Sequence, residues 1–279
     1  MAVIIGSLTE KIFGRLRSQT GDKFQYENGL VLSGGAARGF AHPGVIKALH
    51  ENGVYPDCIS GTSAGAIVGV FYADGFEPEE IIELFKKKKV FNFVNIALGR
   101  KGLLSISGLE KTLKNNLRAK KFDQLQKPFY VASTNFNSGE VVYFHEGDLV
   151  EKVVASSSIP VLFKPVEIGG ALYVDGGVLD NLPHTPLKGK CRNLIGVHVN
   201  YTGPEKEINN LMEIAERAFH LSIGARIKEI ADELDVFIEP EELKHFSVTD
   251  VGEGDKMFRI GYEEATKVLK EAGMVDAGA

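Results

Sequence analysis

Short apolar segments that end in glycine-rich turns and run directly into helical segments place the strongest constraint on the fold of this chain. The run Gly29–Leu32 ends in a Ser-Gly-Gly turn, and a helical pattern over 41–51 follows. The segment 56–60 leads into Gly61-Thr62-Ser63-Ala64-Gly65, which small apolar residues over 66–73 continue. Because crossover helices connect the parallel strands of a sheet, this alternation predicts an α/β protein.

The rest of the sequence continues the alternation of strand and helix patterns. Pro78 suits the first position of a helix that runs to about residue 85, and Ser107 with Glu110 forms a capping box for a helix over 109–117. The pattern predicts a three-layer α/β/α sandwich with a mostly parallel central sheet, in which 29–279 form one domain behind a polar N-terminal leader, 1–28. Further strands are expected at 129–132, 141–144, 171–174, 194–199 and 236–238, and further helices at about 208–234 and 256–271.

Composition excludes several classes of function. The chain has 32 Lys and Arg against 37 Asp and Glu, a net charge of −5, so it lacks the basic character typical of nucleic-acid binding and no nucleic-acid partner is expected. Its seven histidines and two cysteines show no metal-ligand spacing, and we expect neither a metal site nor another cofactor. The apolar start is shorter than a signal-peptide core, and no apolar run approaches the roughly 20 residues of a membrane span. These features predict a cytoplasmic protein.

The segment Gly61–Gly65 fits the pattern G-x-S-x-G, in which a serine occupies a sharp turn between a strand and a helix. Glycine at both ends of the pattern tolerates unusual backbone angles and avoids clashes in the turn. The turn places the serine hydroxyl beside the free N–H groups of a helix N-terminus, which favour developing negative charge. Ser63 is therefore a candidate nucleophile, and an ordinary Gly/Ser turn is the alternative.

A second glycine-rich loop, Gly34–Gly39, follows the first expected strand directly. Its exposed N–H groups could hold an oxyanion or a phosphate. A dinucleotide-binding loop is one alternative, but Ala36 stands where G-x-G-x-x-G has its second glycine, and no clear acidic residue ends a second strand at the right distance. A structural turn is the other alternative. The serine elbow that follows in the chain favours the oxyanion interpretation.

Three motifs in this order, the loop Gly34–Gly39, the elbow Gly61–Gly65 and the triplet Asp175-Gly176-Gly177, resemble those of the patatin-like phospholipases, in particular the compact single-domain bacterial members. The resemblance covers residues 29–200 best. It implies a patatin-like fold and a serine acyl hydrolase that acts on lipid carboxylic esters, of phospholipase A, lysophospholipase or carboxylesterase type, in lipid catabolism. Two further segments, 155–160 and 180–183, also resemble that family.

The resemblance implies a catalytic dyad of serine and aspartate. Ser63 would attack the ester carbonyl and form a covalent acyl-enzyme, while Asp175 would accept its proton. A carboxylate with an ordinary pKa of about 4 is a poor base for an alcohol, so the dyad needs a dry site in which the tetrahedral charge is stabilised. Arg38 would add positive charge near the oxyanion loop. The other residues implied are an oxyanion hole at Gly34, Gly35, Ala36, Arg38 and Gly39, a nucleophile elbow at Gly61, Thr62, Ala64 and Gly65, and an Asp-Gly-Gly turn at Gly176 and Gly177.

Other assignments stay open on the sequence alone. His184 and His198 follow Asp175 in the chain order of a Ser-Asp-His hydrolase, although we expect His198 to be a packed core residue and His184 to bond local backbone groups. His42 lies beside the oxyanion loop and would help to shape it. An acyltransferase would use the same acyl-enzyme, and a lipid-binding regulatory protein would keep the fold without turnover. An oxidoreductase that binds a dinucleotide is the most distant alternative.

Residues 86–101 combine four lysines, an apolar stretch over 90–98 and a second basic pair. The lysines end an expected helix, where positive charge favours the helix dipole. The alternative hypothesis is a flap that makes transient contact with an anionic lipid surface and admits an acyl chain. Such a flap would place the protein peripherally at a membrane.

Overall fold

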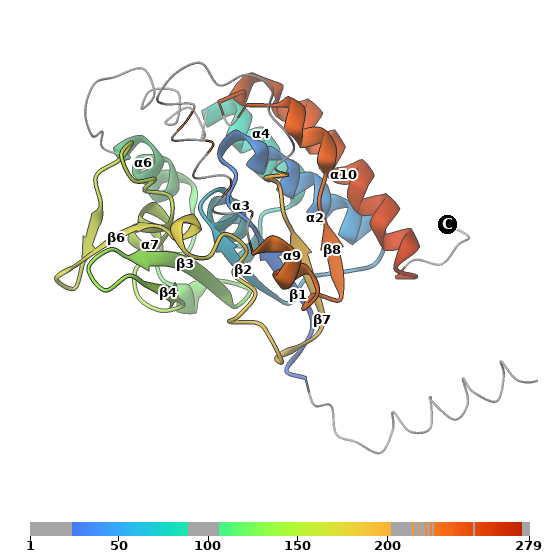
Figure 1. The fold of residues 1–279 in the computed structure, drawn as a ribbon, viewed down its shortest axis with the longest axis horizontal. Coiled ribbons are helices and arrows are strands. Elements are labelled where there is room, and N and C mark those ends of the chain that lie inside the picture. Colours follow the sequence, from blue (N-terminus) through green and yellow to red (C-terminus); the bar gives the residue numbers. More distant parts are fainter. Residues whose placement is uncertain are drawn as a thin grey trace, which may run out of the picture.

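The computed structural model describes residues 24–88, 106–201, 226–247 and 249–274, together with the single positions 214, 217, 221 and 224. At its centre is an eight-stranded sheet in the order β5-β6-β3-β2-β1-β7-β8, with β4 paired to β3 outside this path (Figure 1). The pairs β1–β2, β1–β7, β2–β3 and β7–β8 are parallel, and the pairs that β3 forms with β4 and β6, and β5 with β6, are antiparallel. The strands are β1 (Tyr26–Leu32), β2 (Cys58–Thr62), β3 (Phe129–Asn135), β4 (Glu140–Phe144), β5 (Val166–Ile168), β6 (Ala171–Asp175), β7 (Cys191–Val197) and β8 (Val236–Ile238).

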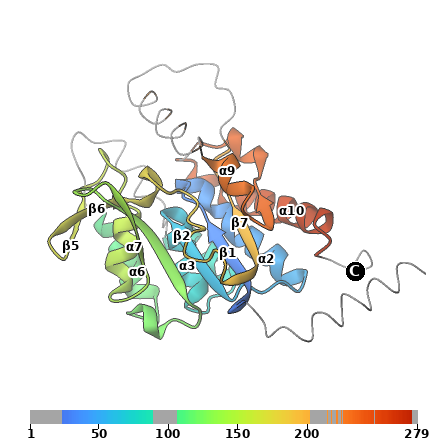
Figure 2. The ribbon, with the colours of Figure 1, turned by 60° about the horizontal axis from the view of Figure 1, so that its bottom comes forward.

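Helices cover both faces of this sheet, as Figure 2 shows from a second side. Side chains alternate along a strand, so Leu30 and Leu32 of β1 enter a large core, whereas Val31 enters a smaller core on the other face with Ile227 and Ile230. This is the mostly parallel α/β/α sandwich that the sequence predicts. The large core packs against α2 (Ala41–Glu51), α3 (Ala64–Ala73), α4 (Pro78–Lys88), α6 (Ser107–Asn116), α7 (Leu149–Ser156) and α10 (Gly254–Glu271), and the smaller core against α9 (Ile227–Ala231).

Helices α2 and α10 touch backbone to backbone. A Cβ atom added at Gly44 of α2 would lie 1.9 Å from the carbonyl oxygen of Phe258, and one added at Gly261 of α10 would lie 2.3 Å from that of Ala41. Both distances are far below van der Waals contact, so only glycine allows the helices to approach this closely. The C-terminal helix is thereby held against the helix that follows the first glycine-rich loop.

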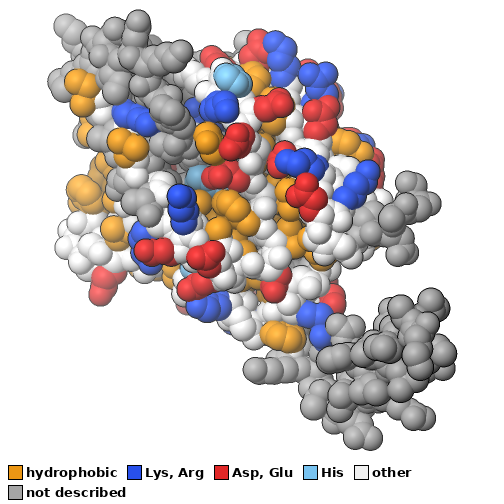
Figure 3. All heavy atoms as spheres, turned by 45° about the vertical axis from the view of Figure 1, so that its right-hand side comes forward, with side chains coloured by type: hydrophobic (Ala, Val, Ile, Leu, Met, Phe, Trp, Pro, Cys, Tyr) orange, Lys and Arg blue, Asp and Glu red, His pale blue; other side chains and the backbone are white. Residues whose placement is uncertain are grey.

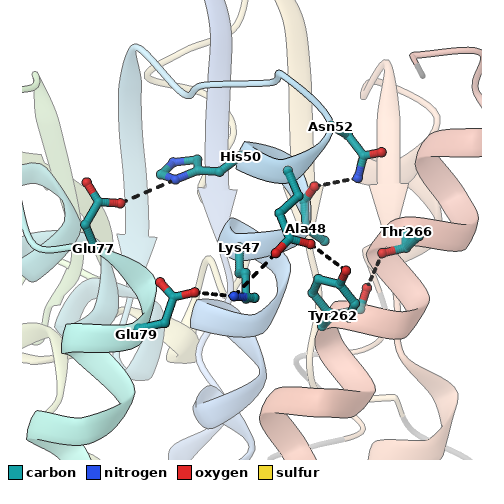
Figure 4. Close-up of polar contacts among 9 residues, drawn as sticks. Lys47, Ala48, His50, Asn52, Glu77, Glu79, Tyr262 and Thr266 are labelled. Atoms are coloured by element: carbon teal, nitrogen blue, oxygen red, sulfur yellow. Dashed lines mark hydrogen bonds and ion pairs between the residues drawn. The ribbon is translucent and has the colours of Figure 1, made fainter. Parts of the chain in front are cut away.

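Polar contacts also join α2 to its neighbours α4 and α10 (Figure 4). Lys47 of α2 bonds Glu79 of α4 and lies 3.4 Å from Glu51, and the hydroxyl of Tyr262 in α10 donates to Glu51 at 2.5 Å. The His50 ring lies 2.9 Å from the hydroxyl of Tyr72. Lys47, Glu51 and Glu79 are partly exposed, and ion pairs of this kind contribute little to stability compared with the packed core.

Charged side chains of both signs are interspersed on the face of the molecule shown in Figure 3. Lys86 of α4 bonds Glu83 at 3.2 Å and Asp255 of α10 at 2.9 Å, and Lys87 lies 3.7 Å from Glu83. These two lysines begin the segment predicted to contact lipid. Residues 89–105, and with them most of that segment, lie outside the described residues.

Most of the expected elements are confirmed, with shifts at their ends. The helix expected at 41–51 and the strand at 236–238 have the predicted bounds, whereas β1 begins three residues early at Tyr26. The predicted capping box at Ser107 is wrong, because Ser107 is the first residue of α6 and the buried Ile106 is its N-cap. The leader up to residue 23 and most of the helix expected from 208 lie outside the described residues. The sequence patterns did not predict β5 or α7.

Candidate active site

The carboxyl ends of β2 and β6 meet along one edge of β3. Strand β2 runs parallel to β3 and ends with Thr62 opposite Ala132, while β6 runs antiparallel and ends with Asp175 opposite Ser133. Because Ala132 and Ser133 are consecutive, the two strands approach each other end to end. The residue after β2 is Ser63, so this register brings Ser63 and Asp175 together from positions far apart in the chain.

Ser63 occupies a strained turn between β2 and α3. Its backbone angles are φ 51° and ψ −118°, which few residues other than glycine adopt. The flanking glycines are required by close packing, since a Cβ at Gly61 would lie 2.6 Å from the carbonyl oxygen of Gly65, and one at Gly65 would lie 2.2 Å from that of Leu32. The turn therefore packs directly on the end of β1, from which the first glycine-rich loop starts. This is the strand-to-helix elbow that the G-x-S-x-G pattern predicts.

Ser63 and Asp175 form a buried pair. Their exposed fractions are 8 % and 3 %, and the Ser63 side chain acts on the Asp175 carboxyl group and lowers its pKa. Burial raises the pKa of Asp175 to about 7, although the hydrogen bonds from Ser63 and from the Gly177 backbone N–H at 2.8 Å act in the opposite direction. A carboxylate with this pKa is a much stronger base than a solvated aspartate. The dry environment that the sequence argument required is present.

The serine run at the end of α7 supports both members of this pair. The Ser156 hydroxyl accepts a hydrogen bond from the backbone N–H of Ser63 at 2.9 Å, and the Ser158 carbonyl accepts one from the backbone N–H of Asp175 at 2.9 Å. Sequence reasoning missed these contacts, although the segment 155–160 had contributed to the family resemblance. A serine run at a helix end was the available signal, but its partners are distant in the chain.

The loop after β1 lies against Ser63. A Cβ at Gly34 would lie 3.2 Å from the Ser63 Cβ and 2.6 Å from Asn181 Oδ1. The Gly34 N–H donates to the Asn181 carbonyl at 3.2 Å, and the Gly34 carbonyl accepts from Asn200 Nδ2 at 2.9 Å. Gly34 therefore leaves space beside Ser63 because it has no side chain. Its N–H already donates to the Asn181 carbonyl and is not available to an oxyanion.

The next residues of the loop enter a short 3₁₀ helix, η1 (Ala36–Phe40). The first N–H groups of a helix have no partner within it, which leaves the amides of Gly35 and Ala36 as candidate anion donors. Ala36 adopts φ 47°, in the left-handed region that favours glycine. A Cβ at Gly35 would lie 2.4 Å from the Val199 side chain, so this position has no room for one.

Arg38 and Gly39 continue η1 and are buried in it. The Arg38 Nε donates to the Phe246 carbonyl at 2.9 Å, and only 8 % of the residue is exposed. Arg38 thus places a positive charge in the element that carries the loop, and it also connects this loop to the C-terminal part of the chain.

The two histidines weighed as alternative bases, His184 and His198, bond other partners, and so does His42 beside the loop. His42 is fully buried and donates from Nε2 to the Ser33 carbonyl at 2.9 Å, and burial lowers its pKa to about 4. His184 Nε2 lies 2.7 Å from a Glu233 oxygen, and His198 Nδ1 lies 2.7 Å from Glu239. His42 therefore shapes the start of the loop, as expected, while His184 pairs with a distant side chain rather than with local backbone. His198 is buried as expected, directly after β7 rather than within it.

Within the described ranges, no group of three or more His, Cys, Asp and Glu side chains is arranged to hold a metal ion. Among the same residues, no helix is both long and apolar enough to cross a membrane.

Fold and site together define an α/β protein in which a G-x-S-x-G elbow on a parallel strand meets an aspartate at the end of an antiparallel strand. The family model of the patatin-like phospholipases matches residues 30–188, more than half of the chain, and the chain belongs to this family. The match includes the loop, the elbow and the Asp-Gly-Gly triplet.

Several known proteins are similar to this chain. An uncharacterised NTE family protein of Mycobacterium bovis is 32% identical over 183 residues, which are 64% of this chain and 51% of that protein. Lysophospholipase nte1 of Aspergillus fumigatus is 34% identical over 182 residues, which are 60% of this chain and 11% of that protein. The chain thus spans about half of the mycobacterial relative and a small part of the fungal one. The crystal structure of VipD from Legionella pneumophila shares the fold, with a TM-score of 0.52 at 16% identity, over 89% of this chain and 67% of that one.

Proposed function

We propose that this protein is a lipid acyl hydrolase of the lysophospholipase or phospholipase A type, which works through a covalent acyl-enzyme on Ser63. The observation that carries the proposal is the placement of Ser63 and Asp175, both buried, where β2 and β6 meet on β3, in a site where burial raises the pKa of Asp175 to about 7. Family membership and the lysophospholipases among the relatives support lipid esters as the substrate class.

In the first half-reaction, the Ser63 oxygen attacks the ester carbonyl carbon while its proton moves to Asp175. The tetrahedral intermediate carries a negative oxygen, which the backbone N–H groups of Gly35 and Ala36 stabilise. When the intermediate collapses, the bond to the leaving alcohol breaks and protonated Asp175 returns its proton to that oxygen. The acyl group is then an ester of Ser63.

In the second half-reaction, water takes the place of the alcohol. Asp175, again ionised, accepts a proton from the water as its oxygen attacks the acyl carbon. Collapse of the second intermediate breaks the bond to Ser63, the proton returns to the serine oxygen, and the fatty acid leaves. One ester bond and one water are consumed in each cycle.

Fluorophosphonate labelling tests the assignment of both residues. We expect the wild-type chain to be labelled once and to hydrolyse both p-nitrophenyl butyrate and lysophosphatidylcholine. Ser63→Ala removes the nucleophile and should abolish labelling and hydrolysis, and Asp175→Asn removes the base and should lower kcat by a factor of about 100 or more. Ser138→Ala, at an exposed position in the β3–β4 turn, is the matched control and should behave as wild type.

Circular dichroism must show that the two variants are folded. Hydrolysis at the wild-type rate by folded Ser63→Ala or folded Asp175→Asn would overturn the proposal.

A further inference from the structure

Ser133 of β3 lies directly opposite Asp175 of β6 in the sheet. In the same ladder, the Phe136 N–H donates to the Leu172 carbonyl at 2.7 Å, so these two residues form a hydrogen-bonded pair. Bonded and non-bonded pairs alternate along an antiparallel ladder, which makes Ser133 and Asp175 a non-bonded pair, with Cα atoms about 4.5 Å apart and side chains close together. Because opposite residues project to the same face, the Ser133 side chain lies beside that of Asp175.

The Ser133 hydroxyl is a buried group that makes no hydrogen bond. The residue is fully buried, and its Oγ has no partner among the residues that the structure describes. In contrast, the hydroxyls of Ser157 and Ser158, next to the helix that packs against β3, each donate to a carbonyl. A buried hydroxyl without a partner costs free energy, and rotation about its Cα–Cβ bond can turn it to another acceptor. The register offers it the Asp175 carboxylate.

Two groups of the protein favour the charged form of Asp175. They are the Ser63 side chain and the Gly177 N–H, which lies 2.8 Å from Oδ1. Both lower the pKa of Asp175, whereas burial raises it. The ionised state of this carboxyl group therefore depends on a small number of hydrogen-bond donors.

Charged side chains nearby do not take part in this balance. Lys152 of α7 bonds Glu151, Asp180 accepts from the Tyr143 hydroxyl, and Glu167 of β5 is exposed. None of these groups contributes to the shifted pKa of Asp175. Strands β3 and β5 and helix α7 pack against β6 (Figure 1), and the titratable side chains of these elements and of the turn that follows are Tyr130, Glu151, Lys152, Glu167, Tyr173 and Asp180.

Acylation would remove one of the two groups that favour the charged form of Asp175. In the acyl-enzyme, the Ser63 oxygen belongs to an ester and carries no proton. Asp175 must nevertheless be ionised at this stage, since it accepts a proton from the attacking water. With the Gly177 N–H alone, burial would favour the neutral acid more strongly than in the free enzyme. A further donor is therefore needed most in the second half-reaction.

We propose that Ser133 is a positioning residue for this second half-reaction, in which its hydroxyl turns to the Asp175 carboxylate and donates to it while Ser63 is acylated. Ser133 then keeps the base ionised as water attacks, and it forms no contact with the substrate. This proposal rests on the hydrolase function proposed above and adds to the site a residue outside its three sequence motifs.

The pH dependence of Ser133→Ala tests the proposal. Single-turnover kinetics with p-nitrophenyl butyrate separate acylation from deacylation. The pKa in the deacylation rate should rise by about one pH unit, because a hydrogen bond to the charged form is lost. The pKa in the acylation rate should change by less than half as much, since the Ser63 hydroxyl is still present. Equal changes in both rates, or an unchanged pKa in deacylation, would overturn the proposal.

Thr134→Val is the matched control. Thr134 is the next residue of β3 and has a buried hydroxyl that likewise makes no hydrogen bond within the described ranges, but it lies opposite Val174 and projects to the other face of the sheet. Both pKa values should equal those of the wild type. A change as large as that in Ser133→Ala would show a general disturbance of β3 and would contradict a specific role of Ser133.

Carbon-13 NMR of the Asp175 carboxyl group tests the role of Ser133 without any turnover. Ser63→Ala lacks the serine hydroxyl as the acyl-enzyme does, and the Asp175 signal is identified by its loss in Asp175→Asn. The pKa of Asp175 should be about one pH unit higher in the double variant Ser63→Ala/Ser133→Ala than in Ser63→Ala. Equal pKa values would overturn the role of Ser133, whereas a wild-type chain that hydrolyses no ester would overturn the hydrolase proposal whatever this titration shows.

Discussion

Asp175 is expected to be a stronger base than an ordinary aspartate because its carboxyl group is buried. The residue is 3 % exposed, and burial raises the pKa of its carboxyl group from 3.8 to about 7 despite two hydrogen bonds that favour the charged form. One oxygen of the carboxylate accepts the Gly177 N–H at 2.8 Å. Such a group is half ionised near neutral pH.

This pKa predicts the pH dependence of hydrolysis. A base acts in its deprotonated form, so kcat/KM for p-nitrophenyl butyrate should rise about tenfold per pH unit below pH 7 and level off above it. The initial rates between pH 5 and pH 9 measure this, with fluorescence-monitored unfolding at each pH to show that the protein is intact. A profile that is flat between pH 5 and pH 7 would show that Asp175 is not the base in this step.

Ala36 stands where the pattern G-x-G-x-x-G has its second glycine, yet it keeps a backbone conformation that favours glycine. The residue takes φ 47°, which costs an alanine of order 1 kcal/mol relative to the right-handed region. Its neighbour Gly34 bonds both Asn181 and Asn200, which hold the loop from two sides. The surrounding contacts therefore keep the loop in the conformation for which a glycine would be expected.

Among the secondary-structure elements, α7 has the most direct influence on the site without contributing a reacting group. It ends in a serine run whose first hydroxyl, from Ser156, accepts the Ser63 N–H, and whose last carbonyl, from Ser158, accepts the Asp175 N–H. One helix terminus thus fixes both backbone segments that carry the pair. The spacing between nucleophile and base depends on the position of this helix.

Ser156→Ala should lower both stability and turnover. It leaves the buried N–H of Ser63 without its acceptor, which costs about 1–3 kcal/mol of unfolding free energy. Because the elbow loses a constraint, kcat should fall more than KM rises. Urea unfolding and steady-state kinetics measure the two effects.

Ser158→Ala is the control for this prediction. Its hydroxyl donates to the Val154 carbonyl, which also accepts from the Ser157 N–H at 3.1 Å and so keeps a partner. A larger loss of stability and turnover in Ser158→Ala than in Ser156→Ala would contradict the role given to the Ser156 hydroxyl.

At the scale of the whole molecule, the contact between α2 and α10 joins an N-terminal helix to the last helix of the described chain. Gly44 and Gly261 let the helix backbones touch, and Arg38 bonds Phe246 nearby in the fold. Since α2 directly follows the loop beside Ser63, the docking of the C-terminal helix also positions that loop. Integrity of the site is therefore coupled to the packing of the last helix.

Gly44→Ala should destabilise the whole protein by about 3 kcal/mol, because the new Cβ meets the backbone of α10, which cannot move aside as a flexible side chain could. Gly108→Ala, in α6 with no atom within 4 Å of its added Cβ, should instead stabilise the protein by about 0.5–1 kcal/mol through helix propensity. Chemical denaturation of both variants measures the contrast. Similar changes in the two would show that the α2–α10 contact is not tightly packed.

Much of the fold was predictable because its determinants are local. Apolar runs of strand length, glycine turns and small-residue helices identified β1, β2, α2 and α3 together with the serine elbow. One steric requirement of the elbow, the contact of Gly61 with Gly65, acts within five residues, so the pattern predicts the turn, whereas the contact of Gly65 with Leu32 of β1 exists only in the folded chain. Two elements were missed for different reasons. Strand β5 has only three residues and depends on its pairing with β6, whereas α7 has a capping Asp148 and apolar residues at helical spacing, a local signal that the sequence interpretation overlooked.

The amino-acid sequence by itself determined the alternation of strands and helices, the sharp turn at Ser63 and, through its three motifs, the family. Only the tertiary structure decided that β2 and β6 meet end to end on β3, and that the serine run at the end of α7 holds the backbone of both Ser63 and Asp175. The reason is physical. Backbone conformation depends mainly on neighbours in the chain, whereas strand register, burial and the pKa of a buried carboxyl group depend on groups that only folding brings together.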